Sequence, residues 1–184
     1  MPRSARIIEP DGVYHIVCRG NNRAKIFYDQ DDFVAFLNII WSCKKEFDYK
    51  LFHYVLLPNH FHLLVQPDTQ TELAAVMKFI NQRTAAYYKI RRDHVGRVFQ
   101  DRYYSSLVAD DAYLLVSGIY IELNPCRAAI VSDPVLYPWS SARHYLLGDI
   151  NPLVDDDPLV LSLAADAVSR QKEYWRLIHS WMEK

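Results

Sequence analysis

Two histidines separated by a single residue stand near the middle of the chain, in the segment His60-Phe61-His62. Side chains alternate between the two faces of a strand, so His60 and His62 are expected to project to one face and Phe61 to the other. Two imidazoles about 7 Å apart along a strand can close on one divalent cation if a third ligand comes from elsewhere. The same spacing also suits two histidines on an ordinary polar sheet face. His53, on the neighbouring strand, is a candidate neighbour of the pair, whereas His15 is expected to be structural.

A second set of reactive side chains lies on a predicted helix. At 3.6 residues per turn, four polar residues fall on one stripe of it, namely Tyr113, Ser117, Tyr120 and Asn124. A phenol can attack an electrophile covalently, and the amide oxygen of an Asn one turn later is a hard ligand that can join two histidines. A separate apolar stripe is expected to face the sheet and consists of Ala112, Leu115, Val116, Ile119 and Leu123. The alternative is an ordinary amphipathic helix with tyrosines at its rim.

The elements that must position these residues are expected in the order β-α-β-β-α-β-α, followed by a helical tail. Hydrophobic periodicity and turn signals predict strands at 13–19, 50–57, 60–66 and 97–108 and helices at about 31–47, 71–92 and 110–124. Asp31 or Asp32 is expected to cap the first helix, and Thr71 and Glu72 to open the second. The third helix should end near Asn124-Pro125, because a following Pro disfavours helical geometry.

This order predicts an α+β fold with a ferredoxin-like or RRM-like antiparallel sheet, helices on one face, and a C-terminal helical extension. We divide the chain into a main domain, residues 1–148, and an acidic loop with a helical tail, residues 149–184. The tail is expected to pack on the domain. The carboxylates of the loop, Asp155-Asp156-Asp157, are expected to be solvated rather than to bind a cation.

The overall composition is that of one globular domain. The chain has 184 residues, of which 51% are hydrophobic and 23% charged, and this argues against disorder. Three widely spaced cysteines without zinc-finger spacing indicate reduced thiols and a cytoplasmic protein. The first residues lack the apolar stretch of a secretory signal, and no apolar run reaches the ~18 residues of a membrane span. We therefore expect no membrane partner.

The formal net charge of −1 excludes a uniformly basic nucleic-acid-binding protein, but the charge is unevenly distributed. Residues 1–107 carry a net charge of +4 and residues 108–184 a net charge of −5. The segment 78–106 includes four tyrosines and carries seven cations, which are Lys78, Arg83, Lys89, Arg91, Arg92, Arg97 and Arg102. Since Lys and Arg neutralise phosphates and aromatic rings stack on unpaired bases, this segment is a candidate nucleic-acid interface. A solvated helix face is the alternative.

Five segments in a fixed order resemble the single-tyrosine HUH transposases, and look closest to the REP-associated tyrosine transposases. They are Tyr-His-Ile-Val-Cys-Arg-Gly-Asn-Asn-Arg (14–23), Tyr-Val-Leu-Leu-Pro-Asn-His-Phe-His-Leu-Leu-Val (54–65), Gly-Arg-Val-Phe-Gln-Asp-Arg-Tyr (96–103), Tyr-Ile-Glu-Leu-Asn-Pro-Cys-Arg-Ala (120–128) and Tyr-Pro-Trp-Ser-Ser (137–141). Together they span about 70% of the chain. The resemblance assigns residues 1–148 to a transposase domain of this kind.

The resemblance implies that Tyr120 attacks a phosphodiester of single-stranded DNA, forms a covalent 5′-phosphotyrosine and releases a 3′-hydroxyl. It further implies that His60, His62 and Asn124 hold Mg²⁺ or Mn²⁺, although better-known simple members carry Gln where this chain has Asn124. Tyr113, the competing tyrosine, lies outside the Tyr-x-x-x-Asn-Pro match. In the REP-associated branch the substrate is a short imperfect hairpin with a flanking tetranucleotide guide.

The side chains expected to contact DNA combine positive charge, amide groups and one ring, and are Arg19, Asn21, Asn22, Arg23, Lys78, Arg83, Arg97, Arg102 and Tyr103. Two other classes of function compete with a transposase. A non-catalytic or domesticated single-stranded nucleic-acid-binding module would not need Tyr120. A metal-dependent hydrolase using His60 and His62 would form no covalent protein–DNA species. Both a monomer and a homodimer agree with the motifs.

Overall fold

The computed structural model describes residue 9, residues 11–68 and residues 72–183. Its centre is a four-stranded antiparallel sheet with the strand order β2-β3-β1-β4. The strands are β1 (Tyr14–Arg19), β2 (Tyr49–Leu57), β3 (His60–Pro67) and β4 (Tyr104–Leu107). One helix connects β1 to β2 and another connects β3 to β4, which is the ferredoxin-like arrangement. The predicted α+β fold is therefore confirmed.

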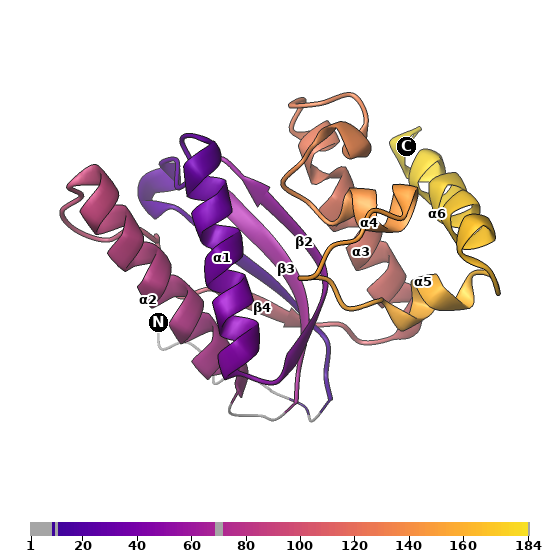
Figure 1. Cartoon of the computed structure of the whole chain (residues 1–184), viewed down its shortest axis with the longest axis horizontal. Coiled ribbons are helices and arrows are strands. Elements are labelled where there is room, and N and C mark those ends of the chain that lie inside the picture. The colour runs from indigo at the N-terminus through magenta and orange to yellow at the C-terminus, as the bar shows by residue number, and fades with distance from the viewer. Residues whose placement is uncertain (1–8, 10, 69–71, 184) are drawn as a thin grey trace.

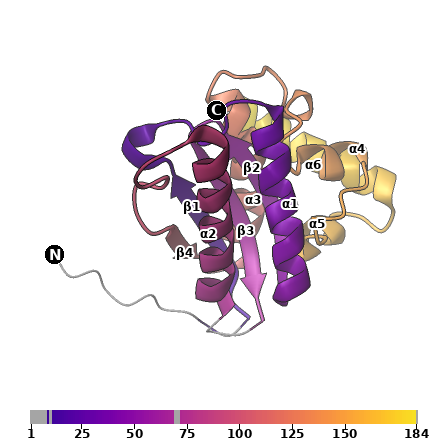
Figure 2. The same ribbon diagram turned by 60° about the vertical axis from the view of Figure 1, so that its left-hand side comes forward.

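Helices α1 (Gln30–Glu46) and α2 (Glu72–Arg92) lie side by side over one face of the sheet (Figure 2). Alternate residues of β1 and β3 point toward these helices, among them Ile16, Phe61 and Leu63, which are buried in the largest hydrophobic cluster. The burial of this face fixes which side chains of the same strands are presented to the opposite face.

The start of α1 differs from the prediction. The side chain of Asp29 accepts the Asp32 N–H at 3.2 Å, so Asp29 is the cap, and Asp31 and Asp32 lie in the first turn. The prediction of a cap at either of those two residues was wrong, because the chain turns helical at Gln30. Helix α2 is described from Glu72, and Thr71 lies outside the described residues.

Helix α3 (Asp111–Arg127) lies against the opposite face of the sheet (Figure 1), so helices cover both faces rather than one. Leu114 and Ile121 pack there with residues of β2 and β3. Gly118 approaches the sheet so closely that a Cβ atom would lie 2.7 Å from Nε2 of His53. The absence of a side chain at this position therefore lets the helix lie close to β2.

The prediction that the apolar stripe of α3 faces the sheet was wrong. Its members Leu115, Ile119 and Leu123 pack instead against the C-terminal helices. This helix is covered on two sides, so its apolar residues form two stripes, and helical periodicity alone does not tell which stripe meets the sheet.

The predicted end of α3 at Asn124-Pro125 was also wrong, since the helix continues through Pro125 to Arg127. The Ala128 N–H donates to the carbonyl of Asn124 at 2.9 Å, and Ala129, with φ of 54°, ends the helix. Pro125 lies in the last turn and lacks the N–H that a helical residue donates to the carbonyl four residues earlier, yet the helix runs on for two more residues.

The helices after α3 form a layer on its outer side (Figure 1). They are α4 (Ala142–Leu147), α5 (Pro158–Ser162) and α6 (Ala167–Met182), preceded by the short helix η2 (Pro134–Leu136). Tyr174 and Ile178 of α6 are fully buried in the hydrophobic cluster that also includes Ile119 and Leu123 of α3. No helix in the described residues is long and apolar enough to cross a bilayer.

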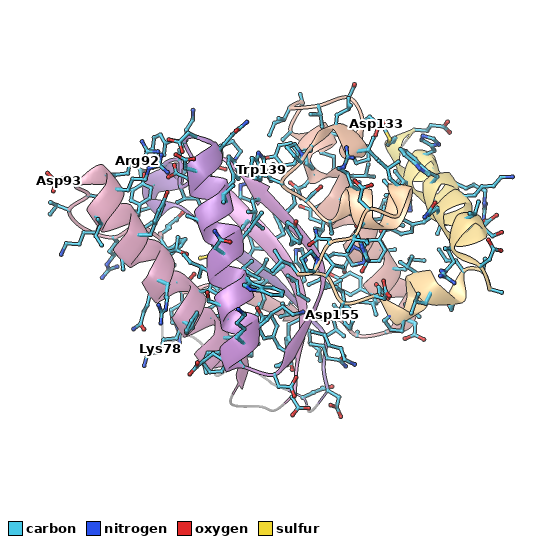
Figure 3. The ribbon with its side chains drawn as sticks, viewed as in Figure 1. Lys78, Arg92, Asp93, Asp133, Trp139 and Asp155 are labelled. Atoms are coloured by element: carbon cyan, nitrogen blue, oxygen red, sulfur yellow. The ribbon has the colours of Figure 1, made fainter. Side chains whose placement is uncertain are left out.

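The acidic loop before α5 was expected to be solvated, and this was wrong. The carboxylate of Asp155 binds the Lys44 ammonium and accepts the Leu51 N–H at 2.7 Å. Asp157 is fully buried, and only Asp156 is exposed. Figure 3 shows Asp155 between the sheet and the C-terminal layer. The loop thus ties the tail to α1 and β2.

Only the last part of the predicted strand 97–108 forms a strand, β4. The preceding residues form a loop that is anchored by backbone hydrogen bonds from Asn21 N to Val98 O at 2.8 Å and from Gln100 N to Arg19 O at 3.0 Å. Val98 is buried there. The loop is therefore pinned beside the short helix η1 (Asn21–Arg23), at the end of β1.

Candidate active site

The His-Phe-His segment begins β3, directly after the two-residue turn Pro58-Asn59. Phe61 enters the core beneath α1, while His60 and His62 lie on the face that α3 covers, as strand alternation predicts. The ring centroids of the two histidines are 5.1 Å apart. The sheet therefore presents two imidazoles side by side toward α3.

Tyr120 of α3 faces His62 of this pair and His15 of β1. Its ring centroid lies 5.8 Å from that of His62 and 5.9 Å from that of His15, with both contacts edge-on. The guanidinium of Arg127, two turns later on α3, lies 5.2 Å from the centroid of the same ring. A phenol, two imidazoles and a cation thus meet at one place.

The polar stripe of α3 lines a cavity of about 350 Å³ between this helix and the sheet. Tyr113, Ser117 and Tyr120 border it from the helix, and His15 and His62 from the strands. Among the described ring contacts, Tyr120 meets the histidines and Tyr113 meets none of them. The geometry therefore separates the two tyrosines in the way that the motif match implied.

Burial favours the neutral form of the site histidines. Burial, and next to it the charge of Arg19, lowers the pKa of His60 to about 4. Burial lowers the pKa of His62 to about 2, to which the neighbouring His15, His60 and Arg19 add, because a positive charge on His62 would be repelled by positive charge on these side chains. Burial lowers the pKa of His15 to about 4. A neutral imidazole keeps a lone pair, which is the form that binds a metal.

Asn124 lies one turn after Tyr120 and is 9% exposed. Its Nδ2 atom is buried without a hydrogen-bond partner among the described residues, and Asn124 is not among the residues that line the Tyr120 cavity. Within the described part of the chain, no group of three or more His, Cys, Asp or Glu side chains could hold a metal ion. His60 and His62 fit a divalent cation only if oxygen ligands complete the set, and the Asn124 amide, water and a phosphate are such ligands.

His15 is the site residue that the sequence prediction missed, because it was expected to be structural. It pairs with Leu64 of β3 and Ser106 of β4, and its Nε2 lies 2.8 Å from Nδ1 of His62. The signal was present, since a ferredoxin-like order places β1 beside β3. Period-two alternation then puts His15 on the face opposite to Ile16, which is the face of His62.

His53 is not a neighbour of the histidine pair. It is completely buried between two carboxylates, with Nδ1 2.8 Å from Glu122 Oε1 and Nε2 3.2 Å from Asp157 Oδ2. Ser141 also donates to Glu122 Oε1, and the ring of Tyr145 stacks on His53. This buried charge cluster joins β2, α3 and the acidic loop.

The buried charge cluster should make stability fall as the pH rises. Burial alone lowers the pKa of His53, but Glu122 and Asp157 outweigh it and raise the pKa from 6.5 to about 9. The imidazolium is therefore favoured by folding, so its contribution is complete below about pH 6.5 and is lost as the pH rises through about 9. We expect the free energy of unfolding to fall by about 2 kcal/mol between about pH 7 and about pH 9. Urea unfolding at several pH values measures this decrease. In a His53→Gln variant the free energy of unfolding should no longer fall with pH over this range. An equal fall in the variant would contradict the assignment of the effect to His53.

Six of the nine predicted DNA-binding residues lie at one end of the sheet. They are exposed and come from the end of β1, from η1 and from the loop after α2, and they are Arg19, Asn21, Asn22, Arg23, Arg97 and Arg102. A groove of about 320 Å³ between Arg19 and Arg102 shares Val17 and Tyr104 with the Tyr120 cavity. The two hollows therefore lie next to each other.

The other three predicted DNA-binding residues do not join this groove. Lys78 and Arg83 belong to α2, on the face of the sheet away from α3, where Figure 3 shows Lys78. Tyr103 is 8% exposed, so its ring cannot stack on a base, whereas Tyr104 is 67% exposed and borders both hollows. The start of β4 at Tyr104 puts these two tyrosines on opposite faces.

Two further cations of the segment 78–106 are used within the protein. Arg91 and Arg92, at the end of α2, form ion pairs with three aspartates around the start of α1, which are Asp29, Asp31 and Asp32. Tyr87 also donates to Asp32 Oδ1 at 3.1 Å. Their charge is therefore largely neutralised before any phosphate could bind.

Comparison with known proteins gives the family and the fold of the chain. Residues 10–124 match the family model for IS200-like transposases, and the chain belongs to this family. A solved REP-associated tyrosine transposase, bound to a REP hairpin, has the same fold: it aligns with a TM-score of 0.70 and 14% identity, covering 86% of this chain and 93% of that chain. A transposase candidate from Deinococcus radiodurans R1 aligns with a TM-score of 0.46 and 15% identity, over 63% of this chain and 92% of that chain. No curated protein matches the chain.

Proposed function

We propose that this chain cleaves and rejoins single-stranded DNA with Tyr120 as the nucleophile. The observation that carries the proposal is the Tyr120 ring, held 5.8 Å from the neutral His62 at the same cavity in a member of a transposase family. A non-catalytic binding module would need neither this tyrosine nor its histidine neighbours.

In the proposed cleavage step, Oη of Tyr120 attacks the phosphorus of a phosphodiester. The bond from phosphorus to the 3′ oxygen breaks, the 5′ phosphate stays on Tyr120, and the 3′ oxygen takes up a proton to leave as a hydroxyl. The phenol gives up one proton, so the protons balance. In the second step a 3′-hydroxyl attacks the phosphotyrosine and restores the phenol. One phosphate ester is exchanged for another at each step, so no external energy source is needed.

His60, His62 and Asn124 would hold Mg²⁺ or Mn²⁺ in this proposal. The bound cation would offset the negative charge that develops on the scissile phosphate. Arg127 places a further positive charge beside the Tyr120 ring, where it can attract the same phosphate. The chain itself supplies the nucleophile and holds it against the phosphate.

The DNA strand is proposed to follow the groove that leaves the Tyr120 cavity toward the end of β1. Arg19 and Arg102 flank this groove, and neither forms an ion pair within the described residues. Tyr104 borders both the groove and the cavity and exposes 67% of its surface, so its ring can stack on an unpaired base.

The two faces of the sheet give matched variants for this strand path. Replacing Arg19 and Arg102 together with Ala should weaken single-stranded DNA binding by about 10–100-fold and lower the salt dependence of log Kd by about 1.4, as expected for two lost phosphate contacts. The control pair Lys78→Ala and Arg83→Ala removes the same charge from the far face and should change Kd less than about twofold. Fluorescence anisotropy at several salt concentrations measures both. Equal losses in the two double variants would contradict the path.

We extend the proposal to hairpin-containing DNA. The support is that the solved transposase with the same fold was bound to a REP hairpin. Single-stranded oligonucleotides with and without an imperfect hairpin would separate this part of the proposal from the cleavage chemistry, because an enzyme indifferent to the hairpin would cut both.

The deciding experiment is to incubate the full chain with labelled single-stranded hairpin DNA and Mg²⁺. We expect a covalent protein–DNA species on a denaturing gel, with the DNA attached to Tyr120 by peptide mapping. Turnover of the DNA without such a species would support a metal-dependent hydrolase instead. Binding without either cleavage or adduct would support the binding module.

A further inference from the structure

The two histidines of the His-Phe-His strand each use Nδ1 for a hydrogen bond. His60 Nδ1 lies 2.6 Å from Oδ1 of Asn59, and His62 Nδ1 lies 2.8 Å from Nε2 of His15. One partner comes from the turn before β3 and the other from the neighbouring strand β1. The Nε2 atom of each ring is not used in any hydrogen bond between described residues.

The turn sets the tautomer of His60. Nδ2 of Asn59 donates to the carbonyl of Arg23 at 3.3 Å, which orients the amide so that its oxygen faces His60. An amide oxygen only accepts, so Nδ1 of His60 carries the hydrogen and Nε2 keeps the lone pair.

His62 and His15 share one N–H between them. His62 is 5% exposed, so leaving its Nδ1 without a partner would be costly. If His62 donates, its Nε2 has the lone pair, as in His60; if His15 donates, Nε2 of His62 carries a hydrogen and cannot bind a cation. A hydrogen bond to the second ring nitrogen of a histidine is the contact by which a neighbouring side chain orients a metal ligand, and His15 makes this contact with His62.

We propose that Asn59 and His15 are positioning residues that hold His60 and His62 in the tautomer whose Nε2 atoms can both bind one divalent cation. The inference rests on the proposed function, because it explains how the chain prepares the cation ligands. Neither residue touches the reacting atoms in this proposal, and each acts through the histidine that it orients.

Manganese affinity tests the proposal without relying on catalysis. His15→Phe keeps an aromatic ring but removes the nitrogen that accepts a hydrogen bond. Asn59→Leu keeps a side chain of similar size in the turn but removes the accepting oxygen. Each variant should weaken Mn²⁺ binding by about 10–100-fold. His15→Gln and Asn59→Asp keep an acceptor oxygen and should restore affinity to within about threefold. Mn²⁺ is titrated by electron paramagnetic resonance with single-stranded oligonucleotide bound, and thermal unfolding verifies that each variant is folded.

The outcomes separate the inference from the proposed function. Absence of Mn²⁺ binding by the unchanged chain would overturn both. Mn²⁺ binding that His15→Phe and Asn59→Leu leave unchanged would overturn the inference alone, as would failure of His15→Gln to restore affinity while folded. If His15→Phe does not fold, the Asn59 variants, which change the turn between β2 and β3, still test the inference. Long-range ¹⁵N NMR of the unchanged chain is expected to show the hydrogen on Nδ1 of both His60 and His62. A hydrogen on Nε2 of His60 would also overturn the inference.

Discussion

Tyr120→Phe should abolish the covalent protein–DNA species and lower strand cleavage by at least ~10³-fold. The variant removes only Oη and keeps the ring against His15 and His62. That hydroxyl forms no hydrogen bond with the described residues, so its loss should not disturb folding. Affinity for single-stranded DNA should stay within about twofold, since Oη acts in the bond exchange rather than in holding the strand. Quantified gels and anisotropy measure the two effects.

Tyr113→Phe is the matched control for this prediction. Tyr113 borders the same cavity from the same helix, yet it makes no ring contact with the site histidines in the described structure. The Tyr113→Phe variant should cleave DNA at a rate within a few fold of that of the unchanged chain. If Tyr120→Phe cuts as well as the unchanged chain, or if Tyr113→Phe loses the adduct instead, the assignment of the nucleophile is wrong.

Glu122→Ala should lower the free energy of unfolding by about 3–5 kcal/mol. Glu122 is fully buried and accepts from both His53 and Ser141, so its removal leaves His53 with Asp157 alone and opens a cavity between α3 and the C-terminal layer. Since Glu122 lies two residues after Tyr120, the same variant should also weaken the packing that holds the nucleophile helix on the sheet. Urea unfolding followed by circular dichroism measures the loss.

The control for the buried charge cluster is an exposed ion pair. Arg143 and Asp149 are bonded at 2.7 Å, but both side chains are nearly half exposed, so Asp149→Ala should cost less than about 1 kcal/mol. A loss for Glu122→Ala as small as that for Asp149→Ala would show that the buried charges contribute little to holding α3 in place.

Local periodicity predicted much of the arrangement of the candidate site. Period-two alternation placed His60 and His62 on one face of β3, and helical spacing placed Tyr113, Ser117 and Tyr120 on one stripe of α3. Both rules depend only on residues close in sequence. Both elements formed, although α3 runs past its predicted end. The order of strands and helices likewise predicted the ferredoxin-like sheet.

The positions of the basic residues in the fold were harder to predict, because charge was counted along the chain. Lys78 and Arg83 lie apart from the candidate site, since α2 packs on the side of the sheet away from α3. Arg92 is paired with aspartates some 60 residues earlier in the chain. Tyr103, which was predicted to contact DNA, is buried, and its neighbour Tyr104 is exposed instead, because a shift of one residue in a strand moves a side chain to the other face.

The sequence by itself determined which side chains share a face within each element, and through them the histidine pair, the tyrosine stripe and the order of the sheet. Only the tertiary structure decided which faces meet. It brought His15 to His62, buried His53 between Glu122 and Asp157, and placed the Arg19 groove beside the Tyr120 cavity. The physical reason is that alternation and helical periodicity act within one element. The pairing of faces depends instead on how α3 is packed between the sheet and the C-terminal helices, and that packing comes from burial across the whole chain.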